Sequence, residues 1–448
     1  MAVRIKSLML ISAVAALPLA PALAQVKPAP PVAKPAAPVA KPPAAQPGAP
    51  IPGNLEPPAV QAPAPPPLPP PFWDQRNVVD LLSFIQSIGG EGLNPKDYDP
   101  DGLMTVLATG DPVRVSAEAT DRFNRVSSDL ALGHVRRSAR IAWFVSDPDL
   151  DSVKQDALLR NALVVHQVGP ALRSLLPNHP QYAALKLALS TTPPTETAKM
   201  NRIRLNLDRW RWLPRDLGEK YIIVNVPGFH ATLVENGVNR WKQRAIAGSV
   251  STPTPQLSAL ATGVMLNPSW EVPNSIAHEV AGKKGFVPVK RPDGKLDHWR
   301  QPPGPSNALG QMKFVMYNPH NIYLHDTNAR SRFSGRMRAL SHGCIRTQNI
   351  HDLAAELGSD DAGQWTREKI DEVLAGTKTV EAKFVKPVPV YIVYFSSAAL
   401  LDGRIVDYQD LYGRDAKALT ALQMKDGGAS LTPPKPKPVA KPEQVATR

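Results

Sequence analysis

The sequence predicts an α+β protein with a mostly helical N-terminal scaffold domain followed by a β-rich domain. Between residues 72 and 190, apolar side chains recur at helix spacing, and the first run ends at Gly89-Gly90. After residue 220, short apolar runs alternate with turn signals such as Asn236-Gly237, which is typical of β-hairpins. We therefore place the scaffold domain at 72–196 and the β-rich domain, a β-sandwich or barrel, at 197–425.

The first 24 residues carry the features of an export signal. Arg4 and Lys6 precede an apolar run from Leu8 to Leu19, and Ala22-Leu23-Ala24 supplies a small-residue cleavage site. A membrane anchor is the alternative, but the run is shorter than the ~20 residues that a spanning helix needs. We expect cleavage of a signal peptide at 1–24 and a periplasmic location.

Two segments have compositions that cannot build a core. Residues 25–71 hold 19 of the 49 prolines, and residues 426–448 are rich in Pro and Lys, so we predict a disordered linker and a disordered tail. The formal net charge of +13 indicates a polyanionic partner. Because export separates the chain from nucleic acid, we expect no nucleic-acid partner. Contact with a carboxylate-bearing wall polymer or an anionic membrane surface fits better, and we expect a monomer.

Period and turn signals predict the elements of the second domain. A helix over 200–212 ends before Pro214, and strands are predicted at 221–226, 231–234, 240–247, 313–317, 322–325, 388–394 and 403–406. Asn349 and Asp352 predict a helix N-terminus shortly after residue 344. Residues 276–310 interrupt the strand pattern with Gly, Pro and Lys, and we interpret them as a lid or, alternatively, a disordered insertion.

Cys344 is the sole cysteine of the chain and cannot form an internal disulfide. It lies in the sequence Ser341-His342-Gly343-Cys344-Ile345-Arg346, and His325 precedes it by 19 residues at the end of an apolar run. A thiol attacks a carbonyl near neutral pH when an imidazole removes its proton. A main-chain carbonyl or the carboxylate of Asp326 can orient that imidazole. The pattern therefore favours a cysteine nucleophile with His325 as base.

The residues around Cys344 support this interpretation. Gly343 allows close approach of the backbone, so the amides of residues 342–344 can form an oxyanion hole, which is worth roughly 3 kcal/mol of barrier. Arg346 offers a fork for a substrate carboxylate. Two alternatives stay open: Cys344 as a small buried apolar residue, or zinc bound by His325, His342 and Cys344. No fourth zinc ligand is evident, and we expect no metal or other cofactor.

The motif resembles the signature of the L,D-transpeptidases, the peptidoglycan-crosslinking cysteine enzymes with a YkuD-type catalytic domain. The supporting segments are similar to the large periplasmic branch of that family; they are Asn206–Pro214, Asn267–Pro273, Gly304–Gly310 and Ile322–Thr327. Large members of this branch often carry a peptidoglycan-binding module between scaffold and catalytic domain. Here only a Thr/Pro linker separates Leu187 from Met200, so that module is expected to be absent.

The resemblance implies a two-step acyl transfer on peptidoglycan stem peptides. Cys344 attacks the carbonyl of an L-configured centre, normally diaminopimelate before a terminal D-Ala, with His325 as base and then acid. The main-chain carbonyl of Asp326 orients the ring. The amine of a second stem then takes the acyl group. The resemblance also assigns residues to the oxyanion site, His342, Gly343 and Cys344, and to the substrate, Arg346, Trp270, Tyr323 and Ser341.

Several outcomes of the same thioester stay open at this stage. Water as acceptor gives an L,D-carboxypeptidase, and a free D-amino acid gives an exchange enzyme. A non-catalytic wall-binding protein with this fold is a further alternative, although the intact His325 and Cys344 speak against it. A papain-like peptidase fits poorly because its cysteine precedes its histidine. The sequence does not distinguish crosslinks from diaminopimelate at stem position 3 from crosslinks from L-Ala at position 1. Acylation of Cys344 by carbapenems is expected from the resemblance.

Overall fold

A computed structural model describes residues 68–399 and 404–431, which belong to one compact unit. The predicted signal peptide, nearly all of the Pro-rich linker and the end of the tail lie outside these residues. Within the described ranges, no helix combines the length and the apolar character needed to cross a membrane.

The scaffold region is helical, as predicted. Its first helices begin at side-chain caps: Asp74 and Asp111 each accept hydrogen bonds from main-chain amides of the following turn, and Pro112 opens the longest helix. Apolar stripes of the first five of these helices share one buried core. The helices are α1 (Gln75–Ser87), α2 (Pro100–Ala108), α3 (Pro112–Leu132), α4 (Ser152–Val164), α5 (Val168–Arg173) and α6 (Pro180–Thr191), with short 3-10 turns at Ile88–Glu91, Pro95–Tyr98 and Arg137–Ala139.

A second core joins the scaffold helices to the β-rich region. It contains side chains from three helices, which are α6, α7 (Thr197–Trp210) and α11 (Asp415–Leu422). Side chains from strands of the large sheet, such as Tyr221, Val234 and Tyr391, complete it. Trp210 stacks on Phe395 with ring centroids 4.6 Å apart. The helix predicted at 200–212 is therefore confirmed as the element that ties both regions together.

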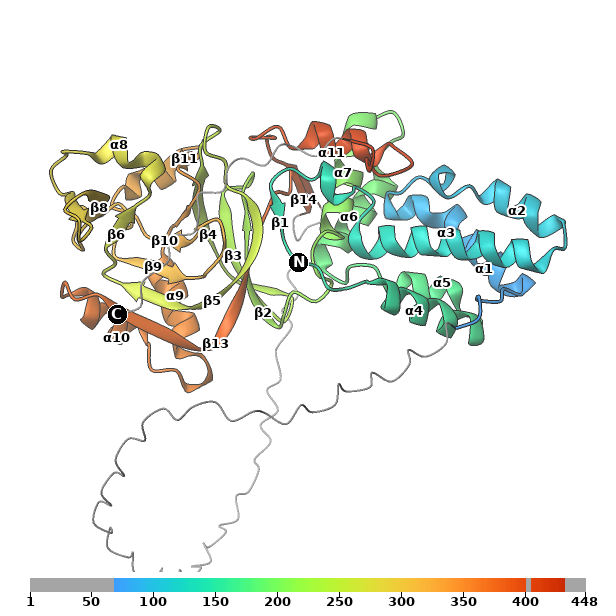
Figure 1. Ribbon diagram of the computed structural model, residues 1–448, viewed down its shortest axis with the longest axis horizontal. Coiled ribbons are helices and arrows are strands. Elements are labelled where there is room, and N and C mark those ends of the chain that lie inside the picture. The colour runs from blue at the N-terminus through green and yellow to red at the C-terminus, as the bar shows by residue number, and fades with distance from the viewer. Residues whose placement is uncertain (1–67, 400–403, 432–448) are drawn as a thin grey trace, which may run out of the picture. The chain divides into compact units, whose positions relative to one another are not determined.

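The β-rich region is built on one ten-stranded sheet (Figure 1). Its order is β1-β5-β13-β2-β3-β4-β12-β10-β9, β11 pairs with β4, and β9 also pairs with β5, so the sheet closes on itself. The fold class is confirmed, in the barrel-like form. The strands are β1 (Trp143–Phe144), β2 (Lys220–Asn225), β3 (His230–Glu235), β4 (Val238–Gly248), β5 (Gln256–Leu266), β9 (Met312–Val315), β10 (Leu324–His325), β11 (Ala339–Ser341), β12 (Ile345–Thr347) and β13 (Val380–Val393).

The core of the sheet is completed by two helices. α9 (Ile350–Ser359) and α10 (Arg367–Leu374) pack against β5 and β13 with their apolar faces, including Leu353 and Leu357 (Figure 1). The predicted hairpin is confirmed, with positive φ at Asn236 and Gly237. The helix after the cysteine motif is present, but Asn349 makes no side-chain cap because it adopts a left-handed φ of 51°.

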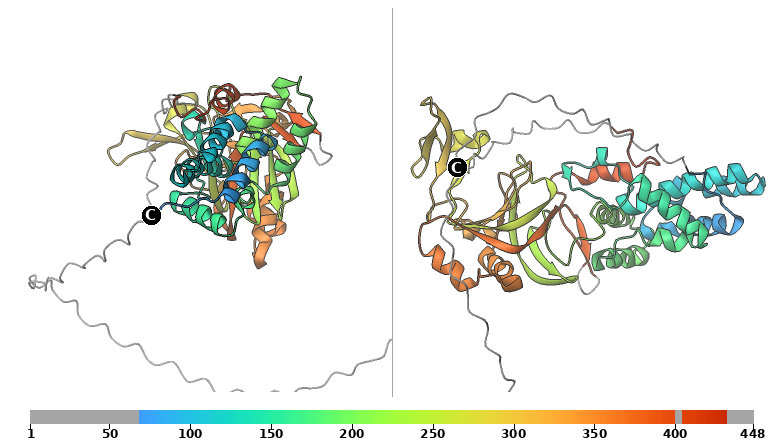
Figure 2. Two further views of the ribbon diagram at one scale, coloured as in Figure 1. Left: turned by 90° about the vertical axis from the view of Figure 1, so that its right-hand side faces the viewer. Right: turned by 60° about the horizontal axis from the view of Figure 1, so that its bottom comes forward.

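The insertion predicted as a lid or a disordered segment is ordered. β6 (Trp270–Val272), β8 (Leu296–Gln301) and β7 (Val287–Lys290) form a separate three-stranded sheet, joined by the short α8 (Ala277–Val280) after a 3-10 turn at Asn274–Ile276 (Figure 2). A small core holds it together, with Trp270, Phe286 and Trp299 packed on Val272, Ile276 and Val280. The three-stranded sheet begins at residue 270, before the predicted start of the insertion at 276, and ends at residue 301, before the predicted end at 310. We call residues 270–301 the cap.

The predicted boundary of the tail at residue 426 is wrong by a few residues. Gly427 accepts a main-chain hydrogen bond from Arg136 at 2.8 Å, and Leu431 packs on the second core. These contacts hold the chain on the scaffold, which composition alone does not reveal. The remaining hairpin, β14 (Ser397–Ala399) and β15 (Ile405–Asp407), lies beside α6 and α7.

Candidate active site

Two adjacent parallel strands place the predicted nucleophile and base on one face of the sheet. In the β10–β12 register, Leu324 pairs with Ile345 and His325 with Arg346. Cys344 lies two residues before Arg346, and side chains two apart share a face of a strand. Tyr323 precedes His325 in the same way, and the two rings lie edge to face with centroids 5.6 Å apart. Tyr323, His325, Cys344 and Arg346 therefore form one group, which we call the catalytic face.

The Cys344 thiol is protonated at neutral pH in this arrangement. Its side chain is half-buried, and Sγ donates a weak hydrogen bond to the Asn321 carbonyl at 3.5 Å. Burial raises the pKa of the thiol to about 11, although hydrogen bonds from Tyr323 and the charges of Lys313 and Arg346 oppose this rise. The thiol therefore needs a base before it can attack, as the residue pattern predicts.

His325 is a neutral imidazole held ready to accept a proton. Burial, followed by the charge of Arg346, lowers the pKa of the ring to about 3, while the main-chain carbonyls of Asp326 and Leu309 favour the protonated form. Nδ1 is buried and has no hydrogen-bond partner among the described residues. The ring and the sulfur lie on the same face but form no direct hydrogen bond.

The carboxylate of Asp326 has partners away from the His325 ring. The carboxylate accepts hydrogen bonds from the Gln311 amide at 3.0 Å and from Arg330 at 3.1 Å, with His351 of α9 at 3.6 Å. Burial alone raises its pKa, but the nearby His351 and the hydrogen bond from the Gln311 amide outweigh this and bring the value to about 2. The carboxylate is therefore engaged away from the His325 ring, and orientation of the ring by the main-chain carbonyl of Asp326 stays a prediction.

The turn before Cys344 changes one part of the oxyanion prediction. Gly343 has φ of 121°, and its amide donates to Ser341 Oγ at 3.1 Å, so this amide is not free for a substrate. Ser341 Oγ in turn donates to the Cys344 carbonyl at 2.6 Å. Ser341 thus organises the turn rather than lining a substrate path. The amides of His342 and Cys344 have no partner within the described chain.

The comparisons identify the domain that carries this geometry. The L,D-transpeptidase catalytic domain model, YkuD, matches residues 219–389, and a scaffold domain model matches residues 69–189. Residues 219–389 are a YkuD-type L,D-transpeptidase catalytic domain. The resemblance inferred from the cysteine motif is thereby confirmed, and a scaffold domain precedes the L,D-transpeptidase domain.

Whole-chain comparisons cover only part of the protein. The Haemophilus influenzae protein named "Putative L,D-transpeptidase" is 30% identical over 239 residues, which is 48% of each chain. The chain thus spans about half the length of the curated relative it matches. Solved structures include an L,D-transpeptidase from Mycobacterium smegmatis, at 14% identity and TM-score 0.21 over 39% of this chain and 58% of that one. The catalytic domain from E. faecium is 15% identical with TM-score 0.22, over 40% of this chain and all of that one.

The cap lies against the catalytic face of the L,D-transpeptidase domain. Glu279 of α8 contacts His342 of the cysteine turn at 3.2 Å, and Trp270 of β6 is close enough to Tyr323 to act, against burial, to lower the pKa of its phenol. Both Trp270 and Tyr323 are half-buried, and their assignment to the substrate stays a prediction. His342 is exposed, and its ring contacts the cap rather than the sulfur.

Arg346 is placed as a free cation beside the thiol. It is half-buried, its Nε has no hydrogen-bond partner, and no carboxylate of the described residues pairs with it. Burial and the neighbouring Arg332 lower its pKa, which shows that cations crowd together here. A substrate carboxylate would relieve both the missing bonds and the repulsion.

Three further side chains shape the L,D-transpeptidase site without having been predicted. Lys313 pairs with His325 across β9 and β10 and lies 5.3 Å from the Tyr323 ring centroid. Thr254 Oγ1 donates to the Gly343 carbonyl at 2.7 Å and accepts from the Gly248 amide at 2.9 Å, which fixes the cysteine turn. His351 supports Asp326. Of these three residues, only Lys313 could have been found from the sequence, because it is the first residue of a predicted strand. The other two contacts depend on segments far apart in sequence.

The zinc alternative finds no support in the geometry. Across residues 68–399 and 404–431, no group of three or more His, Cys, Asp or Glu side chains is arranged to hold a metal ion. His342 turns toward Glu279, and His325 lies on the catalytic face with its carbonyl neighbours.

Proposed function

We propose that this chain is a periplasmic peptidoglycan L,D-transpeptidase. Cys344 attacks an L-centre carbonyl of a donor stem peptide, and the resulting thioester passes its acyl group to the side-chain amine of a diaminopimelate on a second stem. The observation that supports this most strongly is the placement of Cys344 and an unpartnered His325 on one face of adjacent strands in a YkuD-type domain.

Acylation begins from a neutral thiol and a neutral ring. With a thiol pKa of about 11 and an imidazole pKa of about 3, a preformed thiolate–imidazolium pair is disfavoured. The proton therefore leaves Sγ for His325 as the new carbon–sulfur bond forms, which makes His325 a general base. The Asp326 carbonyl holds the ring through this transfer and stabilises the charge that it acquires.

The developing oxyanion is held by the turn. The amides of His342 and Cys344 are the available donors, since the Gly343 amide is occupied by Ser341. Thr254 keeps the Gly343 carbonyl, and with it the whole turn, in position. The imidazolium then returns its proton to the amine of the departing D-Ala, and the carbon–nitrogen bond breaks to leave the thioester.

Transfer repeats these steps in reverse. The acceptor amine attacks the thioester carbonyl, His325 takes a proton from the amine, and the thiol of Cys344 is regenerated with that proton. The exported location is part of the proposal, because the wall is the substrate and the chain begins with a signal-like segment. N-terminal sequencing of the protein recovered from the periplasm tests this part, and an uncleaved N-terminus on a cytoplasmic protein contradicts it.

A variant of the sole cysteine tests the reaction. Wild-type protein and Cys344→Ala are incubated with purified stem-containing muropeptides, and products are separated by mass spectrometry. We expect dimers from the wild type only, with fragmentation showing which centre donates the acyl group. Dimers from Cys344→Ala contradict the proposal, and release of D-Ala without dimers from the wild type indicates an L,D-carboxypeptidase.

A carbapenem provides a probe of the nucleophile that needs no acceptor. Ertapenem acylates the E. faecium L,D-transpeptidase catalytic domain. We expect the intact mass of the wild type to increase by one ertapenem, and the mass of Cys344→Ala to stay unchanged. Circular dichroism of both proteins controls for folding.

A further inference from the structure

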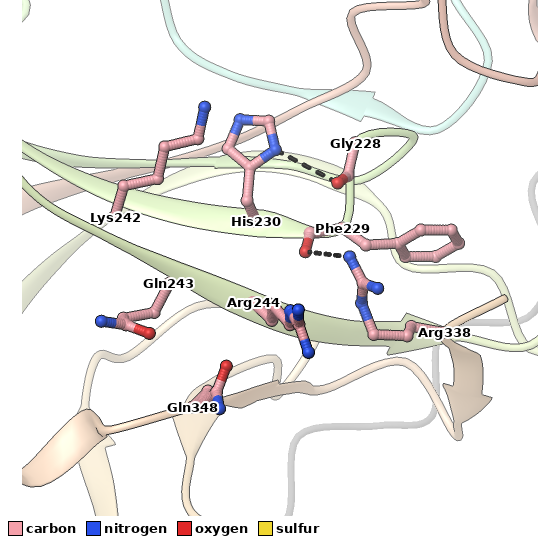
Figure 3. A pocket seen from close by; sticks show the side chains of 8 residues that line it. All are labelled: Gly228, Phe229, His230, Lys242, Gln243, Arg244, Arg338 and Gln348. Carbon is pink, nitrogen blue, oxygen red and sulfur yellow. Dashed lines mark hydrogen bonds between the residues drawn. The ribbon is translucent and has the colours of Figure 1, made fainter. Parts of the chain in front are cut away.

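A hollow lies over β3 and β4 of the same sheet that carries the catalytic face. It has a cavity volume of about 530 Å³, which suits a small peptide segment (Figure 3). The residues that give it its character are His230, Lys242, Gln243, Arg244, Arg338 and Gln348. We call it the basic pocket. None of its lining residues is acidic.

Strand register connects the basic pocket to Cys344. Along β12 and the residues that flank it, Cys344, Arg346 and Gln348 are spaced by two and share a face. Ile246 of β4 pairs with Arg346, and the Gln348 amide donates to the Arg244 carbonyl at 2.9 Å, so Arg244 lies beside Gln348 on that face. At about 3.3 Å per residue, the line from Cys344 to Gln348 is on the order of 13 Å long, with Arg346 near its middle.

The cations of the basic pocket have no acidic partners. Lys242, Arg244 and Arg338 form no ion pair with any residue in the described part of the chain, whereas exposed cations elsewhere often do. Arg338 is held by three carbonyls, those of Ala245 at 3.2 Å, Gly335 at 2.8 Å and Phe229 at 3.1 Å. Carbonyls orient a guanidinium without neutralising it.

Crowding of these charges is evident from the geometry. Arg244 and Arg338 lie next to each other in Figure 3, and Arg244 acts, after burial, to lower the pKa of Arg338. Lys242 and Arg338 likewise oppose protonation of His230, whose pKa burial lowers to about 4. A bound anion would offset this repulsion.

We infer that the basic pocket is a carboxylate-binding subsite for the acceptor stem peptide, and this inference rests on the proposed function. The cations take the carboxylates, and the amides of Gln243 and Gln348 offer both donors and acceptors to a peptide backbone. The cap covers the Trp270–Tyr323 side of the catalytic face, whereas the basic pocket lies on the Arg346 side. A peptide held there presents its side-chain amine toward Cys344 past Arg346, from the side that the cap leaves open.

Binding is measured first, without catalysis. Full-length Cys344→Ala protein is titrated by calorimetry with a free stem tripeptide that ends in diaminopimelate, and with the same peptide carrying amidated carboxylates. The pocket variant adds Lys242→Gln and Arg244→Gln, both exposed side chains. The control adds Lys96→Gln and Arg114→Gln, which remove the same charge from exposed positions of the scaffold.

We expect the pocket variant to raise Kd at least tenfold and the control to change it less than twofold. The amidated peptide should bind weakly, and equally so to both proteins. An unchanged Kd in the pocket variant, an equal loss in the control, or tight binding of the amidated peptide would each overturn the subsite.

Kinetics then decide between acceptor and donor. In proteins that retain Cys344, we expect the pocket variant to raise the KM for the acceptor at least tenfold with a smaller change in kcat. A raised KM for the donor alone overturns the acceptor assignment. If the wild type forms no crosslink while the Cys344→Ala titration still depends on Lys242 and Arg244, the proposed function fails and the carboxylate site stands.

Discussion

Two buried titratable side chains of this protein have opposite surroundings. Asp208, in the core that joins scaffold and sheet, is fully buried and accepts four hydrogen bonds: from the amides of His134 at 2.8 Å and Val135 at 3.0 Å, from Arg211 at 3.0 Å and from Trp212 at 2.8 Å. His325 is 4% exposed, and its Nδ1 has no partner.

The different hydrogen bonding of Asp208 and His325 indicates that the first serves stability and the second serves the reaction. Burial raises the pKa of Asp208, but Arg211 and its neighbours outweigh this and lower it, so the carboxylate is satisfied and has nothing left to bind. The buried imidazole of His325 keeps one ring nitrogen without a hydrogen-bond partner among the described residues. A group left unsatisfied at a cost in stability is expected where a substrate will complete its bonds.

Replacing the catalytic base should give the largest effect on activity. In His325→Asn, we expect the rate of Cys344 acylation to fall about 10²- to 10⁴-fold, since general-base transfer is lost. The free energy of unfolding should change by less than about 1 kcal/mol, because no native hydrogen bond of Nδ1 is removed. Stopped-flow acylation and urea denaturation measure the two quantities. A large loss of stability with activity retained contradicts the assignment.

The pH profile sharpens the same point. With pKa values of about 3 for His325 and about 11 for Cys344, both groups are neutral between these limits. The wild-type acylation rate should therefore be nearly flat from about pH 5 to about pH 9.

In His325→Asn, only the free thiolate reacts, so the rate should rise tenfold per pH unit toward the thiol pKa. Acylation by an uncharged probe at fixed ionic strength measures both profiles. A bell-shaped wild-type profile with its limbs inside this window would instead indicate a preformed ion pair.

Substitution of Asp208, whose hydrogen bonds are all formed, should reduce stability and leave activity nearly unchanged. Asp208→Asn leaves Arg211 buried without its counter-charge, and we expect a loss of about 3–5 kcal/mol in unfolding free energy. The acylation rate per folded molecule should be close to that of the wild type. Chemical denaturation and active-site titration with a carbapenem separate the two effects. A stable Asp208→Asn variant with impaired acylation would contradict the assignment of Asp208 to structure and of His325 to chemistry.

An intermediate effect is expected where structure serves the site. Thr254→Val removes a hydroxyl that bonds both the Gly343 carbonyl and the Gly248 amide. We expect about 1–3 kcal/mol of lost stability from the unsatisfied groups. Displacement of the turn should slow acylation about tenfold or more. Thr254→Ser keeps the hydroxyl and should restore most of both quantities, and failure of that rescue would point to packing of the methyl group instead.

The contact between cap and turn should have the smallest effect. Glu279→Gln weakens an exposed hydrogen bond with His342, and we expect the free energy of unfolding to change by less than about 1 kcal/mol. Acylation should change less than threefold, because Trp270 still joins the cap to Tyr323. A much larger decrease would show that this pair controls access to Cys344, and a high-salt measurement on the wild type should then reproduce it.

The local patterns of the chain were sufficient for most elements near the site. Helical periodicity predicted α1 and α7, and Asn236-Gly237 predicted the hairpin of β3 and β4. These features depend on neighbouring residues alone. β5 was missed because its sequence lacks a clean apolar–polar alternation, and even its apolar Leu260 is exposed. The cap was underestimated because its Gly and Pro residues conceal a three-stranded sheet.

Residue types alone determined the chemistry: one cysteine, a histidine at a strand end and a glycine in the turn between them predict a thiol nucleophile with an imidazole base. Tertiary structure decided which atoms are available for it. The Asp326 carboxylate turns to Gln311, the Gly343 amide is taken by Ser341, and Lys242 and Arg244 line a pocket without acidic residues. Hydrogen bonds and burial depend on neighbours that the sheet brings together. They set the pKa of each group and decide whether it can still form a hydrogen bond with a substrate.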